Sequence, residues 1–283
     1  MNNERSKKPS SGWLQLDGQV CVITGAAGGI GAAIAQTLAA AGARLALLDR
    51  DFDKAQALAA QLQNQAEKQA QNAIIAIGCD IGDAASVAAA AARVASEFGT
   101  ADVLVNNAGL LRPGGIESLS LDDWNAMLRV NLTGYMLCSQ AFGRPMLARG
   151  SGALVHVASI AARYPQTHSG AYSVSKAAVA MLARQLAAEW GPRGVRSNTV
   201  CPGMIRTPLS AAFYTHGDIE ARRSAMTASR RIGEPQDIAN VVASLASDRA
   251  AYVNGAELVV DGGLDAMLMD LVPRPGYEGA AAR

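Results

Sequence analysis

Short β-rich apolar runs alternate with longer helical patterns along most of this chain, and this alternation constrains the fold more than any other feature. The pattern predicts seven strands, at residues 20–24, 44–49, 74–79, 102–106, 153–158, 195–200 and 257–260. It predicts six helices between them, at residues 30–41, 52–70, 84–98, 121–147, 171–190 and 235–247. Because strands joined through helices form right-handed crossovers, we predict an α/β fold, a doubly wound sheet of seven parallel strands with helices on both faces.

Nothing in the sequence marks an internal domain boundary. We therefore predict one domain over residues 16–263, preceded by a disordered polar tail at residues 1–15 and followed by a C-terminal extension at residues 264–283. In open sheets of this kind, ligands bind at the carboxyl ends of the strands, where the strand order reverses. Functional side chains are therefore expected directly after strands.

Composition excludes several kinds of partner and site. Lys and Arg total 25 and Asp and Glu total 24, a net charge of +1, so we expect neither nucleic acid nor an anionic membrane as a partner. The chain has no apolar stretch of membrane-spanning length and no apolar segment behind its N-terminal charges, which favours the cytoplasm. The four cysteines are widely spaced, and His156, His168 and His216 have no metal-ligand spacing, so we expect reduced thiols and no metal site.

A glycine-rich loop directly follows the first predicted strand and opens a helix. It reads Thr24-Gly25-Ala26-Ala27-Gly28-Gly29-Ile30-Gly31. Glycines permit a tight turn, and the helix N-terminus offers free N–H groups and a positive dipole end to a pyrophosphate. Asp49 ends the second strand, 18 residues beyond Gly31, where a carboxylate can accept hydrogen bonds from an adenosine ribose. Together they predict a dinucleotide site.

Tyr172 and Lys176 carry the strongest catalytic signal. Residues four apart lie on one face of a helix, so the ammonium can lie beside the phenol and favour its ionised form. An unperturbed phenol, with a pKa of about 10, exchanges protons poorly at neutral pH, and a neighbouring cation lowers that pKa. Lys176 is the only lysine between Gln69 and the C-terminus. A lone lysine in an arginine-rich chain indicates a need for a compact ammonium.

Two further positions have both a catalytic and a structural interpretation. Ser159 follows the fifth strand and can present its hydroxyl to a substrate oxygen, or it can be a cap or turn residue. Asn131 lies inside a predicted helix, where asparagine is a mediocre helix former. It is either functional or a solvent-facing polar residue.

These motifs resemble those of the short-chain dehydrogenases/reductases, over residues 16–263. The motifs that match this family, in order, are residues 24–31 in the form TGxxxGxG, Asp80, residues 106–109 (Asn-Asn-Ala-Gly), Asn131, Ser159, Tyr172-x-x-x-Lys176, Pro202-Gly203 and Asp261-Gly262-Gly263. The resemblance implies a Rossmann-type fold, the short type of the family, and assembly as a homotetramer built on the helices at 121–147 and 171–190, with the last strand at another interface.

The resemblance also implies roles for individual residues. Tyr172 would be the general acid/base, Ser159 would orient the carbonyl or alcohol, Lys176 would bind the nicotinamide ribose and tune Tyr172, and Asn131 would hold a water in a proton relay. The implied cofactor contacts, besides Asp49, Tyr172 and Lys176, are Gly25, Gly28, Gly29, Ile30, Gly31, Arg50, Asp80, Ile81, Asn107, Ala108, Gly109, Pro202, Gly203, Ile205 and Thr207.

The charge at Asp49 predicts NAD rather than NADP as the cofactor. A carboxylate can accept hydrogen bonds from both ribose hydroxyls, but it repels a 2′-phosphate by on the order of a few kcal/mol in a partly buried site. Arg50 follows and could hold a phosphate, yet Asp51 comes next and Gly28 stands where a basic residue often accompanies phosphate binding in the resembling family. Arg50 can equally stack on adenine or face solvent.

We therefore expect an NAD-dependent oxidoreductase that transfers hydride between a nicotinamide and a secondary alcohol/ketone pair. The alternatives are a 3-oxoacyl-thioester reductase using NADPH, which Asp49 disfavours, and a non-catalytic dinucleotide-binding sensor or scaffold, which would be expected to lose the catalytic residues. Gln166 and His168, between Ser159 and Tyr172, are candidate substrate contacts, although His168 can also be a solvated loop residue. The substrate itself stays open.

The C-terminal extension begins with the apolar run from Leu264 to Pro273. Apolar side chains are costly to leave in water, so we expect them to pack on the protein, across a subunit boundary.

Overall fold

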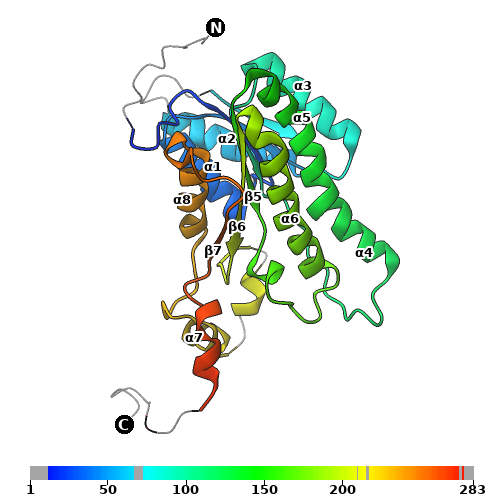
Figure 1. The fold of residues 1–283 in the computed structure, drawn as a ribbon, viewed down its shortest axis with the longest axis vertical. Coiled ribbons are helices and arrows are strands. Elements are labelled where there is room, and N and C mark those ends of the chain that lie inside the picture. Colours follow the sequence, from blue (N-terminus) through cyan, green and yellow to red (C-terminus); the bar gives the residue numbers. More distant parts are fainter. Residues whose placement is uncertain (1–11, 67–72, 209, 215–216, 274–275, 277–283) are drawn as a thin grey trace.

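The computed structural model describes residues 12–66, 73–208, 210–214, 217–273 and 276 (Figure 1). Its strands are β1 (Val20–Thr24), β2 (Arg44–Asp49), β3 (Ile74–Gly78), β4 (Val103–Asn106), β5 (Gly152–Val157), β6 (Val195–Pro202) and β7 (Glu257–Val260). They form one sheet in the order β3-β2-β1-β4-β5-β6-β7, and every pair is parallel. This confirms the predicted parallel sheet, and the strand order reverses between β1 and β4.

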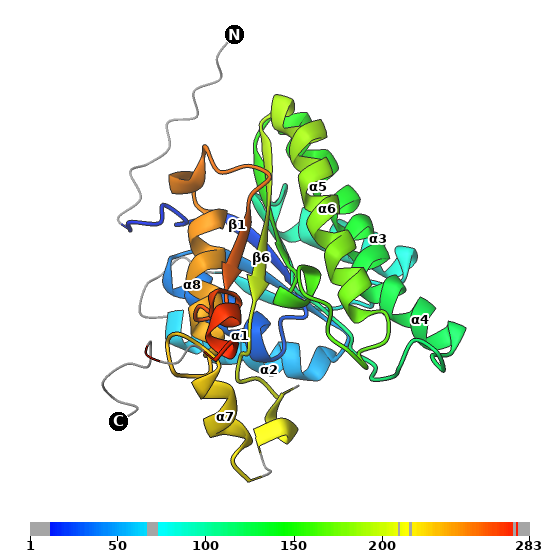
Figure 2. The same ribbon diagram turned by 60° about the horizontal axis from the view of Figure 1, so that its bottom comes forward.

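Helices cover both faces of the sheet (Figure 2). One layer holds α1 (Gly29–Ala40), α2 (Phe52–Ala66) and α8 (Pro235–Ala246), and the other holds α3 (Ala84–Phe98), α5 (Gly134–Arg149) and α6 (Tyr172–Trp190). Successive side chains of a strand point to opposite faces, so β1 contributes Cys21 and Ile23 to one core and Val20 and Val22 to the other. Because both faces are buried, the strands are continuous apolar runs.

The predicted helix at residues 121–147 is not continuous. It consists of α4 (Leu121–Leu128), a π-helical turn (Arg129–Thr133) and α5. The backbone N–H of Gly134 bonds the Arg129 carbonyl, five residues back, so the turn holds one residue more than an α-helical turn does. Periodicity does not reveal this insertion, since apolar residues continue on either side of it. Asn131 lies in the π-turn.

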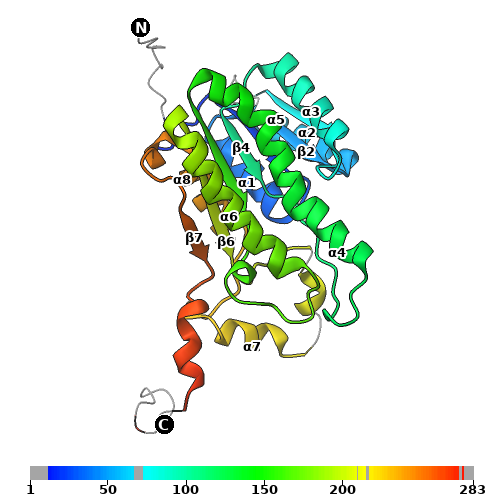
Figure 3. The same cartoon turned by 45° about the vertical axis from the view of Figure 1, so that its right-hand side comes forward.

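The segment after β6 contains structure that the sequence pattern did not predict. A 3₁₀ turn (Ala211–Tyr214) and α7 (Ile219–Ala225) lie below the carboxyl ends of the strands (Figure 3). Another 3₁₀ turn (Asp265–Leu271) follows β7 and projects from the body of the protein. Within this chain Leu268 is 66% and Leu271 is 73% exposed. The expectation that this apolar run packs across a subunit boundary stays a prediction.

Three predicted segments fall partly outside the described residues. The parts outside are residues 1–11 of the predicted tail, residues 67–70 of the predicted second helix, and residues 274, 275 and 277–283 of the predicted extension. Trp13 and Leu14 are described, and their carbonyl oxygens accept hydrogen bonds from Arg249 and Ser247. Of the helices in the described ranges, none has the length and apolar character needed to cross a membrane.

Candidate active site

The glycine-rich loop joins β1 to α1 and packs against the residues that follow β4, the strand beside β1. Gly25 has φ +63°, and a Cβ there would lie 2.6 Å from the Ala108 Cα. A Cβ on Gly31 would lie 2.0 Å from the Gly25 carbonyl oxygen. Both positions therefore require glycine for close backbone approach. Gly28 is the N-cap of α1 without a side-chain cap, and a Cβ there would meet nothing within 4 Å. The first N–H groups of α1 thus border open space and suit a phosphate group.

The Asn107 side chain holds this loop rather than projecting from it. Its amide donates to the carbonyl oxygens of Thr24, 3.1 Å away, and of Gly25, 2.9 Å away. The Thr24 hydroxyl accepts in return from the backbone N–H groups of Asn107 and Ala108. These bonds join the ends of β1 and β4 at the point where the strand order reverses. They place Ala108 beside the glycine turn.

Asp49 ends β2 beside the same loop. Its carboxylate accepts from the backbone N–H of Ala27 at 2.9 Å and of Asp51 at 3.0 Å. Arg50 is exposed. Asp51 forms an ion pair with Lys54, 2.6 Å away. The half-buried carboxylate of Asp49 thus lies next to the helix N-terminus that suits a phosphate.

Asp80 and Ile81 follow β3 along the same edge. The Asp80 carboxylate accepts from the Gly82 backbone N–H at 2.8 Å and lies 3.3 Å from the Arg129 guanidinium. The Ile81 side chain is buried against the start of α5, where a Cβ on Gly134 would lie 2.8 Å from it. Both residues therefore stabilise the turn between β3 and α3.

Ser159, Tyr172 and Lys176 meet at the carboxyl end of β5. Tyr172 begins α6, and its phenol lies beside the Ser159 hydroxyl, which lowers the pKa of the phenol. The Ser159 oxygen also accepts from the Ala161 backbone N–H at 3.1 Å, so it both caps a 3₁₀ turn and contacts Tyr172. Lys176, one turn along α6, is buried, and its ammonium donates to the Val157 carbonyl at 2.9 Å. All three side chains thus surround one strand end.

Burial dominates the ionisation of this group. It raises the pKa of the Tyr172 phenol above its ordinary value, and the neighbouring Ser159 hydroxyl offsets that rise only in part. Burial lowers the pKa of Lys176 to about 8. The sequence predicted a downward shift for Tyr172, and this direction is wrong. The ammonium lies 5.8 Å from the Tyr172 ring centroid and is itself desolvated, so the loss of water around the phenol has the larger effect.

Asn131 joins the π-turn to the chain after β4 and to α6. Its side chain donates to the Leu110 carbonyl at 2.9 Å and accepts from the Leu110 N–H at 2.7 Å. It also donates to the Ser175 hydroxyl at 3.0 Å. Asn131 is fully buried, so its interpretation as a solvent-facing residue is wrong. It holds the chain just after Gly109 against α6; a Cβ on Gly109 would lie 3.6 Å from the Lys176 nitrogen.

The chain that follows β6 lies opposite the glycine-rich loop. Pro202 ends that strand, and a Cβ on Gly203 would lie 2.5 Å from the Asp261 Cβ, so glycine lets this segment pass the Asp-Gly-Gly turn. Ile205 is buried, and Thr207 lies across from the glycine-rich loop, 3.4 Å from where a Gly29 Cβ would be. The glycine loop and this segment therefore face one another.

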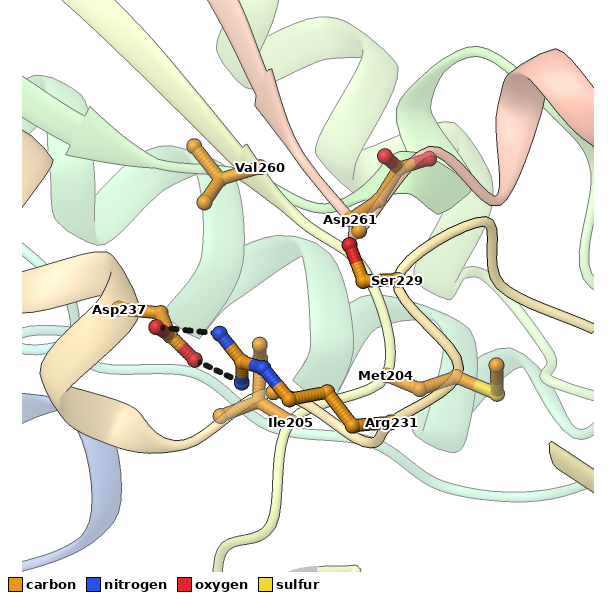
Figure 4. Close-up of a pocket in the computed structure, with 9 residues that line it drawn as sticks. Met204, Ile205, Ser229, Arg231, Asp237, Val260 and Asp261 are labelled. Carbon is orange, nitrogen blue, oxygen red and sulfur yellow. Dashed lines mark hydrogen bonds and ion pairs between the residues drawn. The ribbon is translucent and has the colours of Figure 1, made fainter. Parts of the chain in front are cut away.

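A cavity of about 240 Å³ lies beside this segment (Figure 4). Met204, Ile205 and Val260 form its apolar lining, and Arg231 forms two hydrogen bonds with Asp237 at 2.6 and 2.8 Å. None of the four predicted catalytic residues lines it. It is therefore separate from the group around Tyr172.

The candidate substrate residues Gln166 and His168 lie in an exposed loop before α6. His168 has φ +55°, and its carbonyl accepts from the Gly114 N–H at 3.0 Å. Its ring lies 3.5 Å from where a Gly115 Cβ would be. The loop is thus joined to the chain after β4, and both side chains are exposed.

This chain has counterparts among known proteins. A family model described as Enoyl-(Acyl carrier protein) reductase matches residues 25–265. D-threitol dehydrogenase of Mycolicibacterium smegmatis is 46% identical over 250 residues, covering 88% of this chain and 94% of that protein. The chain belongs to the short-chain dehydrogenases/reductases. This dehydrogenase is a nicotinamide-dependent oxidoreductase that acts on secondary alcohols.

Two further relatives of this short-chain dehydrogenase agree in length and fold. Galactitol 2-dehydrogenase (L-tagatose-forming) of Cereibacter sphaeroides is 40% identical over 255 residues, covering 88% of this chain and 96% of that protein. The crystal structure of a gluconate 5-dehydrogenase from Burkholderia cenocepacia in complex with NADP and tartrate superposes with a TM-score of 0.83 at 33% identity. It covers 89% of this chain and 96% of that one.

Sequence reasoning missed two polar contacts of this dehydrogenase's site. The Ser175 hydroxyl accepts a hydrogen bond from the Asn131 amide, and the Tyr135 hydroxyl lies 3.5 Å from the Lys176 ammonium. Tyr135 comes four residues after Asn131, which places both on one side of the helix. That spacing is a usable signal, but a tyrosine in an apolar run is ordinarily a core residue.

Proposed function

We propose that Tyr172, Ser159, Lys176 and Asn131 are the catalytic machinery for hydride transfer between NAD and a secondary alcohol. The observation that carries this proposal is that the Tyr172 phenol lies beside both the Ser159 hydroxyl and a buried lysine. The nicotinamide, when bound, takes up or returns the hydride. The non-catalytic alternative gains no support, since each of the four positions has a competent side chain in hydrogen-bonding contact with its neighbours.

The protein's own part in the reaction is to move one proton. During oxidation the alcohol proton goes to the Tyr172 oxygen, and during reduction Tyr172 returns it to the new alkoxide. Ser159 orients the substrate oxygen through its hydroxyl. Lys176 favours the ionised phenol by its charge and donates to the nicotinamide ribose. Asn131 fixes the Leu110 backbone to α6, which keeps these groups in register and supports a water in the proton relay.

We propose that the N-terminus of α1 binds the pyrophosphate and that Asp49 accepts from the adenosine ribose hydroxyls. The unfilled space at Gly28 and the half-buried carboxylate at the end of β2 fit these groups. The charge of Asp49 disfavours a 2′-phosphate, which supports NAD. Against this stands the Burkholderia cenocepacia gluconate 5-dehydrogenase, whose structure holds NADP. Lys54 pairs with Asp51, whereas the exposed Arg50 is a cation that could meet a phosphate here.

For the substrate we propose an open-chain polyol or a related sugar acid. D-threitol dehydrogenase and galactitol 2-dehydrogenase are both relatives with high coverage. The exposed loop before α6 offers polar groups, Gln166, Thr167 and His168, which suit several hydroxyls better than an acyl chain. The alternative is a 3-oxoacyl-thioester reductase with NADPH; the matching family model names an acyl carrier protein substrate, but for reduction of an enoyl double bond rather than of a 3-oxo group.

A substrate screen with Tyr172→Phe as its control tests this function. The purified protein is offered polyols, cyclic diols and 3-oxoacyl thioesters with NAD(H) or NADP(H), and the absorbance of the reduced nicotinamide is followed. We expect turnover of a polyol with NAD. Tyr172→Phe should lower kcat by about 10²- to 10⁴-fold while cofactor binding persists, because only the exchangeable proton is removed. Turnover confined to acyl thioesters, or an active Tyr172→Phe, would refute the proposal.

For the assembly we propose a homotetramer, and for the location the cytoplasm. Val174 and Met181 on α6 are 49% and 58% exposed, and Leu121 on α4 is 71% exposed. Apolar side chains at such exposure favour contact with another copy. Sedimentation of the purified protein tests the tetramer.

A further inference from the structure

The Lys176 ammonium has a second neighbour besides the Val157 carbonyl. The side chain is 3% exposed, and its nitrogen lies 3.5 Å from the hydroxyl oxygen of Tyr135 on α5. It also lies 5.3 Å from the centroid of the Tyr135 ring, within range of a cation–π interaction. Tyr135 is itself fully buried. One tyrosine therefore contacts the ammonium with both its ring and its hydroxyl.

The hydrogen bonding around Tyr135 determines which partner donates. The Tyr135 hydroxyl donates to the Val157 carbonyl at 3.0 Å, the same oxygen that Lys176 reaches at 2.9 Å. A phenol has one proton, so the remaining lone pairs of its oxygen can accept from the ammonium. Two of the three ammonium N–H groups thus have acceptors on the inner side, and the third is left for Tyr172 or a ribose hydroxyl.

The described residues supply no negative charge that would offset the cost of burying this ammonium. Within the described residues, no carboxylate forms an ion pair with Lys176. The titratable groups that face Lys176 or Tyr135 from the packed elements are Tyr172 on α6, Cys138 on α5, His156 on β5 and Cys201 on β6. Burial raises the pKa of both thiols and of Tyr172 and lowers that of His156 to about 3, so all four are neutral near pH 7.

The π-turn and α5 hold α6 at two successive points. Asn131 bonds Ser175, and Tyr135, the next turn along, contacts Lys176. We propose that Tyr135 is a positioning residue, whose hydroxyl and ring hold the Lys176 ammonium, charged, at the end of β5. This inference rests on the proposed function of Lys176, but its main test does not depend on activity.

The chain permits a direct test because it has five lysines, Lys7, Lys8, Lys54, Lys68 and Lys176. Lysine labelled with ¹³C at Cε allows each amine to be titrated by NMR, and Lys176→Met identifies the Lys176 signal. Tyr135→Phe keeps the ring and removes the acceptor, which favours the neutral amine. We expect the Lys176 pKa to fall by about one unit, a tenfold change in acid dissociation. The high-pH limb of kcat/KM should move to lower pH by a similar amount.

Ser139→Ala is the matched control. The Ser139 hydroxyl donates to the Tyr135 backbone carbonyl at 2.7 Å and accepts from Asn106, but it does not bond Lys176. Its Lys176 pKa should equal that of the parent protein. Thermal unfolding checks that each variant is folded, and Tyr135→Met supplies a second variant without the hydroxyl if Tyr135→Phe is unstable.

The outcomes separate this inference from the proposed function. An unchanged Lys176 pKa in folded Tyr135→Phe, or an equal fall in Ser139→Ala, would overturn the positioning role. An active Lys176→Met would instead overturn the proposed catalytic function, whatever the titration shows.

Discussion

The Asp49 carboxylate accepts a hydrogen bond from the backbone N–H of Ala27, 2.9 Å away, and so joins the end of β2 to the glycine-rich loop. The residue that would select the cofactor therefore also stabilises the loop that would bind its phosphates. Replacing it tests both roles, and the choice of substitution separates them.

Asp49→Asn should narrow the preference for NAD over NADP. The amide oxygen can still accept from Ala27, while the charge that repels a 2′-phosphate is removed. A few kcal/mol of repulsion corresponds to a preference of about tenfold to several hundredfold, so we expect the ratio of kcat/KM values to fall by at least about tenfold. Asp49→Ala loses the acceptor as well and should also lower the melting temperature. A parent protein that prefers NADP would contradict the assignment.

Lys176→Arg should disable the enzyme although it preserves the charge. The ammonium is enclosed between the Val157 carbonyl and Tyr135, and a planar guanidinium is too large for that place and directs its N–H groups differently. We expect kcat to fall by about 10²-fold or more in steady-state assays. Lys54→Arg, at an exposed position, is the control and should be neutral. Near-normal turnover by Lys176→Arg would show that Lys176 has another role.

His156 should make the protein sensitive to acid. It is fully buried, with the Asn106 amide 3.2 Å from Nδ1 and the Ser197 hydroxyl 3.1 Å from Nε2, and burial lowers its pKa from 6.5 to about 3. Between these values the unfolded chain binds a proton that the native state does not. Stability is therefore lost as the pH falls from 6.5 toward 3, by about 1.4 kcal/mol per pH unit from this group.

His156→Gln isolates that contribution. Glutamine can keep hydrogen bonds to Asn106 and Ser197 but does not titrate. Denaturant unfolding at pH 4.5, 5.5 and 6.5 should show a slope against pH that is smaller by about one proton in the variant. Equal slopes in the two proteins would mean that His156 is protonated in the folded state.

Truncation after Gly263 should change assembly or substrate affinity. It removes the exposed Leu268 and Leu271, which we expect to lie against another copy. It also removes Asp265, 3.7 Å from Arg163 in the turn that follows Ser159. That half-exposed ion pair contributes less than about 1 kcal/mol, so any large effect has to come from the apolar contacts.

The full-length variant Leu268→Ser/Leu271→Ser should behave like the truncated protein in sedimentation. Tyr252→Ser, at a fully exposed site elsewhere, serves as its control. If truncation leaves both sedimentation and KM unaltered, the extension has no part in assembly.

The sequence by itself determined the seven strands, their parallel arrangement and the place of the glycine-rich loop. Strand and helix periodicities are local, and a sheet buried on both faces needs the apolar runs that mark β1 or β5. Asp49, Ser159 and Tyr172 could be found for the same reason, because each lies at or close to the end of a strand or the start of a helix. The break at Arg129–Thr133 could not, because a π-turn leaves the apolar pattern on either side intact.

Only the tertiary structure decided the environment of the candidate catalytic group. Asn131 and Ser175 are 44 residues apart, and Tyr135 and Lys176 are 41 apart, yet each pair is in contact. Burial around Tyr172 depends on every element packed there, so the helical spacing of Tyr172 and Lys176 led to the wrong direction for the phenol's pKa. The spacing of two residues on a helix predicts which charge lies nearest to the phenol. The loss of water around the phenol, which has the larger effect on its pKa, depends on how the whole chain packs.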